Sequence, residues 1–479
     1  MDLTNFLSNN KSILIAPAGH GKTHAIVECL KYSEGLSLIL THTHAGVASI
    51  REKVKKEEMA NVKYHIETIS SFLQRLVLSF DNNSEKPQQE NSKEYHEYIN
   101  TSSLHILKKG LVRKVISLTY TRLFVDEYQD CSLQQHQAIC ILSTLFPTHL
   151  FGDSMQGIFD FQNQDMVDIE NDQIMGDFNQ KRYFLEEPWR WKNVQREDLG
   201  RSIISIRNSL LNKEQIYLEH YKEDINIIKV KAYEKRKESN LYTEEEQFKK
   251  YIYSLKAEKS VLIIFPEAYN TDSRKEFIKF FGDSFFMIES IDDKKFYDDA
   301  KLFDSLSTDN YETILSDFFL NNFTNLGEWM NGNRFKTKRD AVQKQKVENI
   351  LKLYSSLKNG ISLRVVSKIV KLVFALDGVR TYRKDLYNSL LIAFENAFSE
   401  NITVFEAMKN HRNNIRRVGR KVFGKCVGTT LLTKGLEFDK VVVINAHKFN
   451  CPKNLYVSLS RACKELTIVT NSMILEPYK

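Results

Sequence analysis

The sequence predicts an α/β protein built from two lobes, each formed around a parallel sheet. Short apolar strands that run into polar edges recur towards both ends of the chain, as in SLILTHTH and RLFVDEYQD, and later in DKVVVINAH. Such strands are typical of a parallel sheet whose functional site lies at the carboxyl ends of the strands. A chain of 479 residues is also too long for one hydrophobic core.

The strand pattern changes at several points, and these points divide the chain. Apolar spacing in ENILKLYSSLKNGISLRVVSKIVKLVFAL predicts helices in the region that lacks strands. We expect a first lobe with a short inserted subdomain and a second lobe with a helical inserted subdomain. The expected segments are 1–78 and 119–188 for the first lobe, 79–118 for its insertion, 189–292 and 425–479 for the second lobe, and 293–424 for its insertion.

Composition and charge are those of a globular protein, with 42% apolar and 27% charged residues and a net charge of +7. No apolar run approaches the roughly 20 residues of a membrane span. The start, MDLTNFLSNN, has no basic cluster followed by an apolar stretch, as a secretory signal would. We therefore expect a cytoplasmic protein without a membrane partner. The mild positive charge permits a polyanionic partner but does not establish one.

The stretch ILIAPAGHGKTHAI places a glycine-containing turn and a lysine after a short apolar run. Glycines let successive amide groups point into one concavity, and the following helix directs its positive end to the same place. Lys22 would contact the outer phosphates and the Thr23 hydroxyl would hold magnesium. An ordinary strand-to-helix turn is the alternative. The pattern predicts a nucleotide site, here called the phosphate loop, at Ala16, Pro17, Ala18, Gly19, His20, Gly21, Lys22 and Thr23, with His24 following.

Two adjacent carboxylates, Asp126 and Glu127, end the apolar strand of LFVDEYQD. An aspartate there can hold magnesium, and a neighbouring glutamate can polarise the attacking water. After the next strand, in LFGDSMQGIFDF, Gln156 can contact the γ-phosphate or the attacking water. The pattern predicts Thr23 and Asp126 as metal ligands and Lys22, Glu127 and Gln156 as catalytic residues. The alternatives are a solvated acidic turn and an ordinary polar loop.

These stretches, in this order, resemble the UvrD/Rep family of superfamily 1 DNA helicases. The resemblance extends to THTHAGVASIREKV, TISSFLQRLV, FLEEPWRW, LLTKGLEFDKVVVI and LYVSLSRACKEL. It implies two RecA-like lobes of the P-loop NTPase class, with ATP and Mg²⁺ bound in the cleft between them. It also implies that Arg190 contacts the γ-phosphate, that Gly435 and Glu437 contribute to the nucleotide site, and that Arg461 acts as an arginine finger in the transition state.

The resemblance also implies single-stranded DNA or DNA ends as the partner, with contacts at Thr43, His44 and Ser70. Phe159 and Phe161 could stack on bases, because any aromatic face can hold a base. Ordinary core aromatics are the alternative for both.

The basic stretch KNHRNNIRRVGRKVFGK contains no acid. A solvated helix face usually mixes charges of both signs, so this run favours contacts with the phosphate backbone. It predicts Arg412, Arg416 and Arg417 as DNA-binding residues.

The predicted function is a DNA-dependent ATPase that couples ATP hydrolysis to translocation on single-stranded DNA or to unwinding. Leu431 stands where the family usually has a histidine, and the first insertion is short. The compact chain also resembles the helicase-like subunit of the two-gene Gabija anti-phage system, which partners an OLD-family nuclease. The alternative is a non-processive NTPase that senses DNA ends and regulates a partner nuclease.

Overall fold

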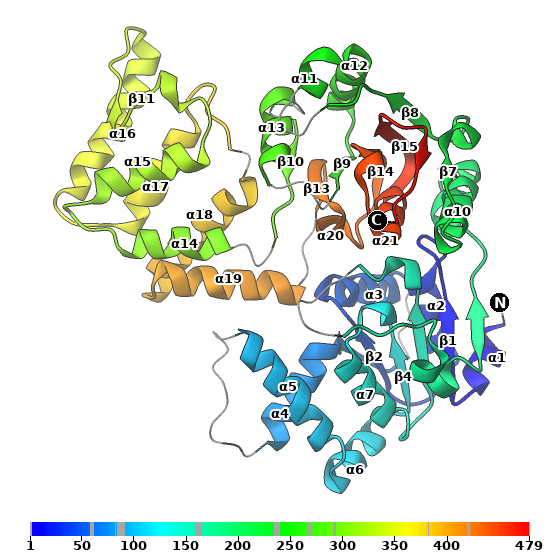
Figure 1. The fold of residues 1–479 in the computed structure, drawn as a ribbon. Helices are drawn as coiled ribbons and strands as arrows, with labels where there is room; N and C mark the ends of the chain where they lie inside the picture. The colour runs from blue at the N-terminus through cyan, green and yellow to red at the C-terminus, as the bar shows by residue number, and fades with distance from the viewer. Residues whose placement is uncertain are drawn as a thin grey trace.

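The computed structural model describes residues 2–57, 62–81, 83, 92–158, 165–233, 240–266, 271–282, 284–290, 294–381, 383–418 and 422–478. Two six-stranded sheets form the centres of two lobes, one built from the blue and cyan part of the chain and the other mainly from green and red parts (Figure 1). Every neighbouring pair in both sheets is parallel. The predicted α/β fold with two parallel-sheet lobes is confirmed.

The first sheet has the strand order β3-β2-β4-β5-β1-β6. Its strands are β1 (Lys11–Ile15), β2 (Ser37–Thr41), β3 (Tyr64–Thr68), β4 (Arg122–Val125), β5 (Thr148–Gly152) and β6 (Arg182–Phe184). Because the strands are parallel, the loops that follow β1, β4 and β5 leave the sheet at one edge. β5 lies between β4 and β1, so the segment after β5 is flanked by the phosphate loop and by the paired carboxylates.

Helices cover both faces of the first sheet, because successive strand residues point to opposite faces. Ile13 and Ile15 join one core, and Leu14 joins the other. Ile99 and Ile116, from the expected first insertion, belong to the same core as Ile13, so this segment packs as part of the lobe. The helices are α1 (Leu3–Ser8), α2 (Lys22–Lys31), α3 (His44–Lys56), α4 (Ile69–Phe80), α5 (Ser92–Ile106), α6 (Gly110–Thr119), α7 (Leu133–Leu142) and α8 (Asp172–Met175).

The second sheet has the strand order β10-β13-β9-β14-β15-β8. Its strands are β8 (Asn226–Lys229), β9 (Val261–Phe265), β10 (Phe286–Met287), β13 (Lys425–Thr429), β14 (Phe438–Val443) and β15 (Ala462–Thr470). Two residues of β9 show the same alternation, since Leu262 joins one core and Ile263 joins the other. A short antiparallel pair, β7 (Ile216–Tyr217) with β16 (Ile474–Leu475), lies outside the sheet.

The helices of the second lobe pack on both faces of its sheet. They are α9 (Trp189–Lys192), α10 (Glu197–Leu211), α11 (Asn240–Glu244), α12 (Glu246–Ser254), α13 (Thr271–Phe281), α20 (Thr430–Thr433) and α21 (Pro452–Leu459). α9 follows the last strand of the first sheet, and its Trp191 is fully buried in the core of the second lobe. The link between the lobes is therefore a packed element.

Between β10 and β13 the chain forms a helical unit with its own core, drawn in yellow and light orange in Figure 1. Its elements are α14 (Lys294–Asp304), α15 (Tyr311–Asn322), β11 (Met330–Asn331), β12 (Arg334–Phe335), α16 (Ala341–Leu357), α17 (Leu363–Phe374), α18 (Lys384–Glu400) and α19 (Val404–Val418). A buried ion pair of 2.7 Å between Arg383 and Glu289 joins it to the second lobe. α19 contacts α3 of the first lobe. In the described part of the chain, no helix is both long and apolar enough to cross a bilayer.

Candidate nucleotide site

The phosphate loop adopts a conformation that depends on its glycines. Gly19 has φ +76° and Gly21, the N-cap of α2, has φ +88°. Residues that carry a side chain rarely adopt such positive φ angles. A Cβ atom at Gly19 would also lie 2.9 Å from Arg190 Cβ and 2.9 Å from the Trp191 ring. Gly19 therefore provides both the turn and the space that the link between the lobes occupies.

Lys22 meets both predicted carboxylates at the edge of the first sheet. Its Nζ lies 2.6 Å from Glu127 Oε1 and 3.5 Å from Asp126 Oδ1. Burial by itself would lower the pKa of Lys22, but the two carboxylates outweigh it and raise that pKa. Burial raises the pKa of Asp126, whereas Lys22 holds the pKa of Glu127 below its usual range against the effect of burial. The site thus pairs a lysine cation with an ionised Glu127.

Glu127 occupies the left-handed region, with φ +53° and ψ +41°. This region is uncommon for a residue with a long side chain, and it costs about 1–3 kcal/mol. Besides Lys22, the carboxylate accepts a hydrogen bond from Gln129 Nε2 at 2.5 Å. Two fixed partners and a strained backbone thus hold Glu127 at one position.

Gln156 lies in the turn Ser154–Gln156 that follows β5, and it is buried. Its side-chain Nε2 donates to Asp153 Oδ2 at 3.0 Å, and its backbone carbonyl accepts from Lys434 Nζ at 2.6 Å. The amide is therefore held at both its side chain and its backbone. The strand order places it beside the segment of Glu127, as the predicted role requires.

Arg190 joins the phosphate loop to the second lobe. Its backbone N–H donates to Gly19 O at 2.9 Å, and its Nη2 lies 2.6 Å from Glu437 Oε1. Burial would raise the pKa of Glu437, but Arg190 outweighs it and lowers that pKa. Gly435, two residues earlier, has φ +79°. The structure brings these predicted residues to one place beside the loop.

Arg461 is almost fully buried, and the second lobe binds all its nitrogen atoms. Nε donates to Val457 O at 2.8 Å, Nη1 to Leu436 O at 3.2 Å and Nη2 to Ser460 Oγ at 2.9 Å. Burial and the neighbouring Arg190 lower the pKa of Arg461 to about 10. Glu127 is among the charges that act on it. Its role as an arginine finger stays a prediction.

The second lobe also supplies two contacts that the motifs did not predict. Lys434 Nζ forms an ion pair with Asp130, 2.5 Å from Oδ1, and both groups are buried. Burial raises the pKa of Asp130 to about 7. The Tyr456 hydroxyl accepts a hydrogen bond from Ala18 N of the phosphate loop at 2.9 Å. The side chains of Asp130, Lys434 and Tyr456 lie inside stretches that carry the family resemblance. Their place in these stretches is the only feature of the sequence that could have pointed to the two contacts.

The predicted DNA contacts have different outcomes. Thr43 caps α3 by accepting from Gly46 N, and His44 begins that helix. Ser70 lies on α4, with its Oγ 3.5 Å from Gln135 Nε2. These residues follow β2 and β3, at the edge that also carries the nucleotide site. Phe159 and Phe161 lie outside the described residues. Arg416 and Arg417 lie on the helix α19, where the description covers their backbone.

The prediction that Arg412 binds DNA is wrong. The side chain is 0% exposed, and its guanidinium lies 3.8 Å from the centroid of the Phe296 ring. Nη1 donates to Ser389 Oγ and Nη2 to Ser290 O, each at 3.3 Å. Arg412 therefore anchors α19 inside the helical unit and has no surface for a phosphate.

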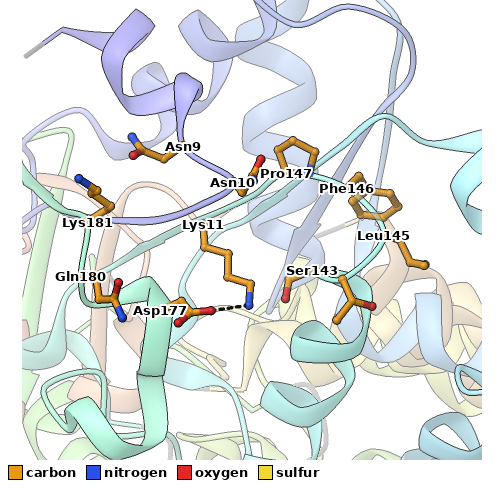
Figure 2. Close-up of a pocket in the computed structure, with 11 residues that line it drawn as sticks. Asn9, Asn10, Lys11, Ser143, Leu145, Phe146, Pro147, Asp177, Gln180 and Lys181 are labelled. Atoms are coloured by element: carbon orange, nitrogen blue, oxygen red, sulfur yellow. Dashed lines mark hydrogen bonds and ion pairs between the residues drawn. The ribbon is translucent and has the colours of Figure 1, made fainter.

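Two other features of the first lobe lie apart from this chemistry. A hollow of about 580 Å³ is lined by residues that include Lys11, Pro147 and Lys181 (Figure 2). These residues lie at the amino ends of strands of the first sheet, so the hollow is at the edge opposite the phosphate loop. Its Lys11 already pairs with Asp177 at 2.9 Å.

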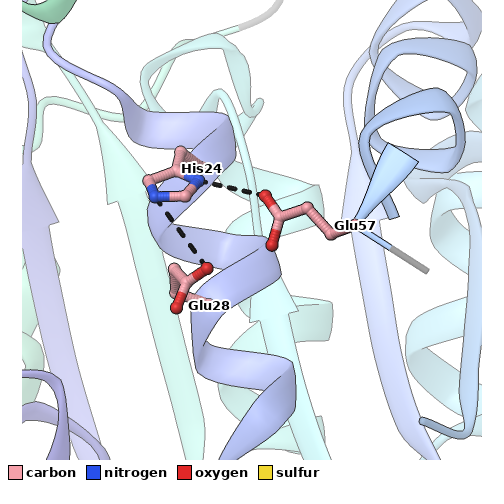
Figure 3. A group of neighbouring side chains, drawn as sticks. All are labelled: His24, Glu28 and Glu57. Atoms are coloured by element: carbon pink, nitrogen blue, oxygen red, sulfur yellow. Dashed lines mark hydrogen bonds and ion pairs between the residues drawn. The ribbon is translucent and has the colours of Figure 1, made fainter. Parts of the chain in front are cut away.

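His24, Glu28 and Glu57 stand close enough to share a cation (Figure 3). His24 Nδ1 lies 3.2 Å from Glu57 Oε1. Lys31 Nζ contacts Glu28 and lies 3.0 Å from Glu57 Oε2, so a lysine already balances one of the two carboxylate charges. His24, predicted as part of the nucleotide site, is half-exposed at the start of α2.

Comparisons with known proteins give a family match over the first lobe. Residues 3–162 match a family model described as an AAA domain. No curated protein matches the chain. The chain is similar to the crystal structure of Pif1 helicase from Candida albicans, with 12% identity and a TM-score of 0.35 over 98% of this chain and 93% of that one. It is also similar to Pif1 helicase from Bacteroides in complex with ADP-AlF3 and ssDNA, with 12% identity and a TM-score of 0.34 over 99% of this chain and 92% of that one.

The phosphate loop with its carboxylates and the matched AAA domain define a nucleotide site of the P-loop type in the first of two parallel-sheet lobes. The order of its motifs identifies the class more closely. That order resembles the order of the motifs in superfamily 1 helicases, and the family model covers the first lobe alone.

Proposed function

We propose that the protein is a DNA-dependent ATPase that couples ATP hydrolysis to movement along single-stranded DNA. One observation carries this proposal: the second lobe contacts the phosphate loop itself, through Arg190 N to Gly19 O and through Tyr456 to Ala18 N. A nucleotide bound at this loop would change the contacts between the lobes. Cycles of binding and hydrolysis would then open and close them, as a stepping motor requires.

The hydrolytic chemistry follows from the pair of Lys22 and Glu127. A γ-phosphate next to Lys22 would compete with Glu127 for the ammonium group. The released carboxylate would orient a water molecule and accept its proton, while the water oxygen bonds to the γ-phosphorus and the bond to the leaving oxygen breaks. Gln156, held by Asp153, would contact the same water or the phosphate. Arg190 and Arg461 would neutralise the charge that develops on the phosphate oxygens.

A Mg²⁺ ion fits the donor set that the site offers. The Thr23 hydroxyl and the Asp126 carboxylate supply only oxygen, which is the ligand type that Mg²⁺ prefers. Asp126 Oδ1 already accepts from Glu127 N at 2.9 Å and lies near Lys22, so its second oxygen is the better placed ligand. The ion would neutralise phosphate charge, and the residues described above would hold the substrate and the water.

Single-stranded DNA is the proposed partner at the edge formed by Thr43, His44 and Ser70. The segments of these residues follow β2 and β3; β2 pairs with β4, and β3 pairs with β2 at the edge of the sheet. DNA here would lie beside the segments that respond to nucleotide. Arg416 and Arg417 would add contacts with the phosphate backbone.

Steady-state ATP hydrolysis, measured with and without single-stranded DNA, tests the proposal. We expect DNA to stimulate the rate, and Lys22→Ala to abolish it. This variant should also melt lower, because it leaves the Asp126 and Glu127 carboxylates without their cation. Hydrolysis that does not respond to DNA would refute the proposed coupling. Normal hydrolysis by Lys22→Ala would refute the nucleotide site.

The alternative is a sensor that binds DNA ends and regulates a partner nuclease, such as the OLD-family nuclease of an anti-phage pair. Leu431, at the position where the family usually has a histidine, is 41% exposed and favours this alternative. A strand-displacement assay separates the two. A motor displaces the strand as it hydrolyses ATP, whereas a sensor hydrolyses ATP and leaves the duplex intact.

A further inference from the structure

A buried ion pair crosses between the lobes beside Gln156. Arg207 on α10 donates its Nη2 to Asp153 Oδ1 at 2.6 Å. Asp153 is 0% exposed and Arg207 is 8% exposed. Asp153 follows β5 of the first lobe, whereas α10 packs into the core of the second lobe. None of the motifs assigned a role to Arg207.

Asp153 fixes the direction in which the Gln156 amide faces. Its Oδ2 accepts from Gln156 Nε2 at 3.0 Å, and its Oδ1 also accepts from Met155 N at 3.2 Å. Only the NH₂ end of an amide can donate to a carboxylate, so the carbonyl end of Gln156 must face away from Asp153. That end can accept a hydrogen bond from water, which is the polarity that orienting a nucleophile requires.

The same turn also holds the catalytic glutamate. Asp153 N donates to Gln129 Oε1 at 3.0 Å, and Gln129 Nε2 donates to Glu127 Oε2 at 2.5 Å. A continuous set of hydrogen bonds thus runs from Arg207 through Asp153 to both Gln156 and Glu127. In a buried network of this kind, the loss of one charged member leaves its partner uncompensated.

Arg207 is also linked to the phosphate loop. Its guanidinium lies 5.8 Å from the centroid of the Tyr456 ring, and the Tyr456 hydroxyl accepts from Ala18 N. The second lobe therefore contacts the phosphate loop and the hydrolysis segment at neighbouring points. Withdrawal of the second lobe would release both together.

We propose that Arg207 is a positioning residue through which the second lobe orients Gln156 and Glu127, so that hydrolysis proceeds only while the lobes are in contact. The inference deepens the proposed function and rests on it. Arg207 acts through Asp153 and does not touch the nucleotide. Its loss should therefore slow hydrolysis and leave nucleotide affinity largely unchanged.

The test compares Arg207→Met, Arg207→Lys and the double variant Arg207→Met/Asp153→Asn, which removes both buried charges. Arg201→Met, at an exposed position on the same helix, is the matched control. Three quantities are measured on the full chain: the dissociation constant of a non-hydrolysable ATP analogue, the single-turnover rate, and amide hydrogen exchange of residues 153–158. The exchange measurement needs no nucleotide.

We expect Arg207→Met to slow turnover by about 10²-fold, the scale of a small misplacement of reacting groups. Exchange of residues 153–158 should rise, analogue affinity should persist, and Arg207→Lys should recover part of the rate. The double variant should turn over as slowly as Arg207→Met, and Arg201→Met should behave as the wild type.

Unchanged turnover and exchange in Arg207→Met would overturn the proposal, and so would a parallel loss of affinity, turnover and melting temperature. If the wild type fails to hydrolyse ATP, the proposed function itself fails. The exchange of residues 153–158 then decides alone whether Arg207 orders this segment.

Discussion

At the scale of single residues, Lys22 and Glu127 hold each other in a form that a nucleotide would disturb. Their ion pair of 2.6 Å is partly buried. Glu127 raises the pKa of Lys22 and Lys22 lowers the pKa of Glu127, so each favours the charged state of the other. The left-handed backbone of Glu127 adds strain that only a surrounding structure can maintain. The position of this pair at the edge of the first sheet could be predicted from the sequence, because both motifs are local. The strain could not, because it depends on the tertiary partners.

Glu127→Gln should bind ATP and hydrolyse it at least about 10²-fold more slowly, because the amide keeps the shape but cannot accept the proton of the water. Single-turnover hydrolysis and nucleotide binding check this. Glu34→Gln, an exposed glutamate of the same lobe, is the control. Equal losses of binding and turnover would show instead that Glu127 holds the metal or the fold.

His149 gives the first lobe a dependence on pH. Burial, followed by the neighbouring Arg122, lowers the pKa of His149 from 6.5 to about 3. Below pH 6.5 the unfolded chain therefore binds a proton that the folded chain excludes, and the free energy of unfolding falls as the pH falls towards 3. The loss over this range is on the order of 4 kcal/mol.

Urea unfolding at pH 7, 5.5 and 4.5 measures that dependence, with His149→Gln as the comparison. The variant should be less stable at pH 7, because it loses the contacts with Ser12 and Arg122. It should also lose less stability on acidification. A variant whose stability falls as steeply as that of the wild type would show that His149 is not the responsible group.

At the scale of elements, the phosphate loop joins β1 to α2 and also receives the link between the lobes. Gly19→Ala should weaken nucleotide binding and slow hydrolysis, because the angle of φ +76° becomes strained and the new Cβ would clash with Arg190 and Trp191. The strain alone is about 1–2 kcal/mol. Isothermal titration with an ATP analogue measures the effect. Gly110→Ala, where a Cβ has nothing within 4 Å, should bind normally. Normal binding by Gly19→Ala would contradict the role given to this turn.

The helix α19 shows what a sequence pattern can and cannot predict. Helices were expected across residues 293–424, and the basic run begins on one of them, α19. The burial of Arg412 could not be predicted, because Phe296 and Ser389 reach it only after α14 and α18 have packed. By contrast, the strands around Leu14 and Phe124 could be predicted, because short runs of apolar residues are typical of buried strands in a parallel sheet.

Reversing the charges of Arg416 and Arg417 to glutamate should weaken DNA binding and its salt dependence without changing basal hydrolysis. Contacts with phosphates release counterions, so each lost contact lowers the slope of log affinity against log salt by about 0.7 for a single strand. Fluorescence anisotropy at several salt concentrations measures this. Lys368→Glu with Lys371→Glu on α17, both exposed, changes the net charge equally and serves as the control. Equal effects of the two pairs would assign the loss to net charge alone.

At the scale of the whole molecule, contacts between distant parts of the chain define the site. Arg190 reaches Gly19, Lys434 reaches Asp130, Arg207 reaches Asp153 and Tyr456 reaches Ala18. Each of these pairs joins the two lobes or the link between them. The order of motifs indicates that the lobes meet, but it does not indicate which side chains pair, because that depends on how two finished lobes dock. For this reason the contacts of Arg207 and Tyr456 with the first lobe could not be predicted from the sequence.

Single-turnover ATP hydrolysis by Arg461→Lys and Arg461→Ala tests most directly whether the two lobes share one active site. Measured at saturating ATP and well below the melting temperature, both variants should bind nucleotide and hydrolyse it about 10³-fold more slowly than the wild type. Arg461→Ala should also melt lower, because it removes the donor from the Leu436 carbonyl and leaves the Val457 carbonyl with Ser460 Oγ. Normal turnover in both variants, with only the melting temperature lowered, would remove Arg461 from the active site and contradict a nucleotide site built by both lobes.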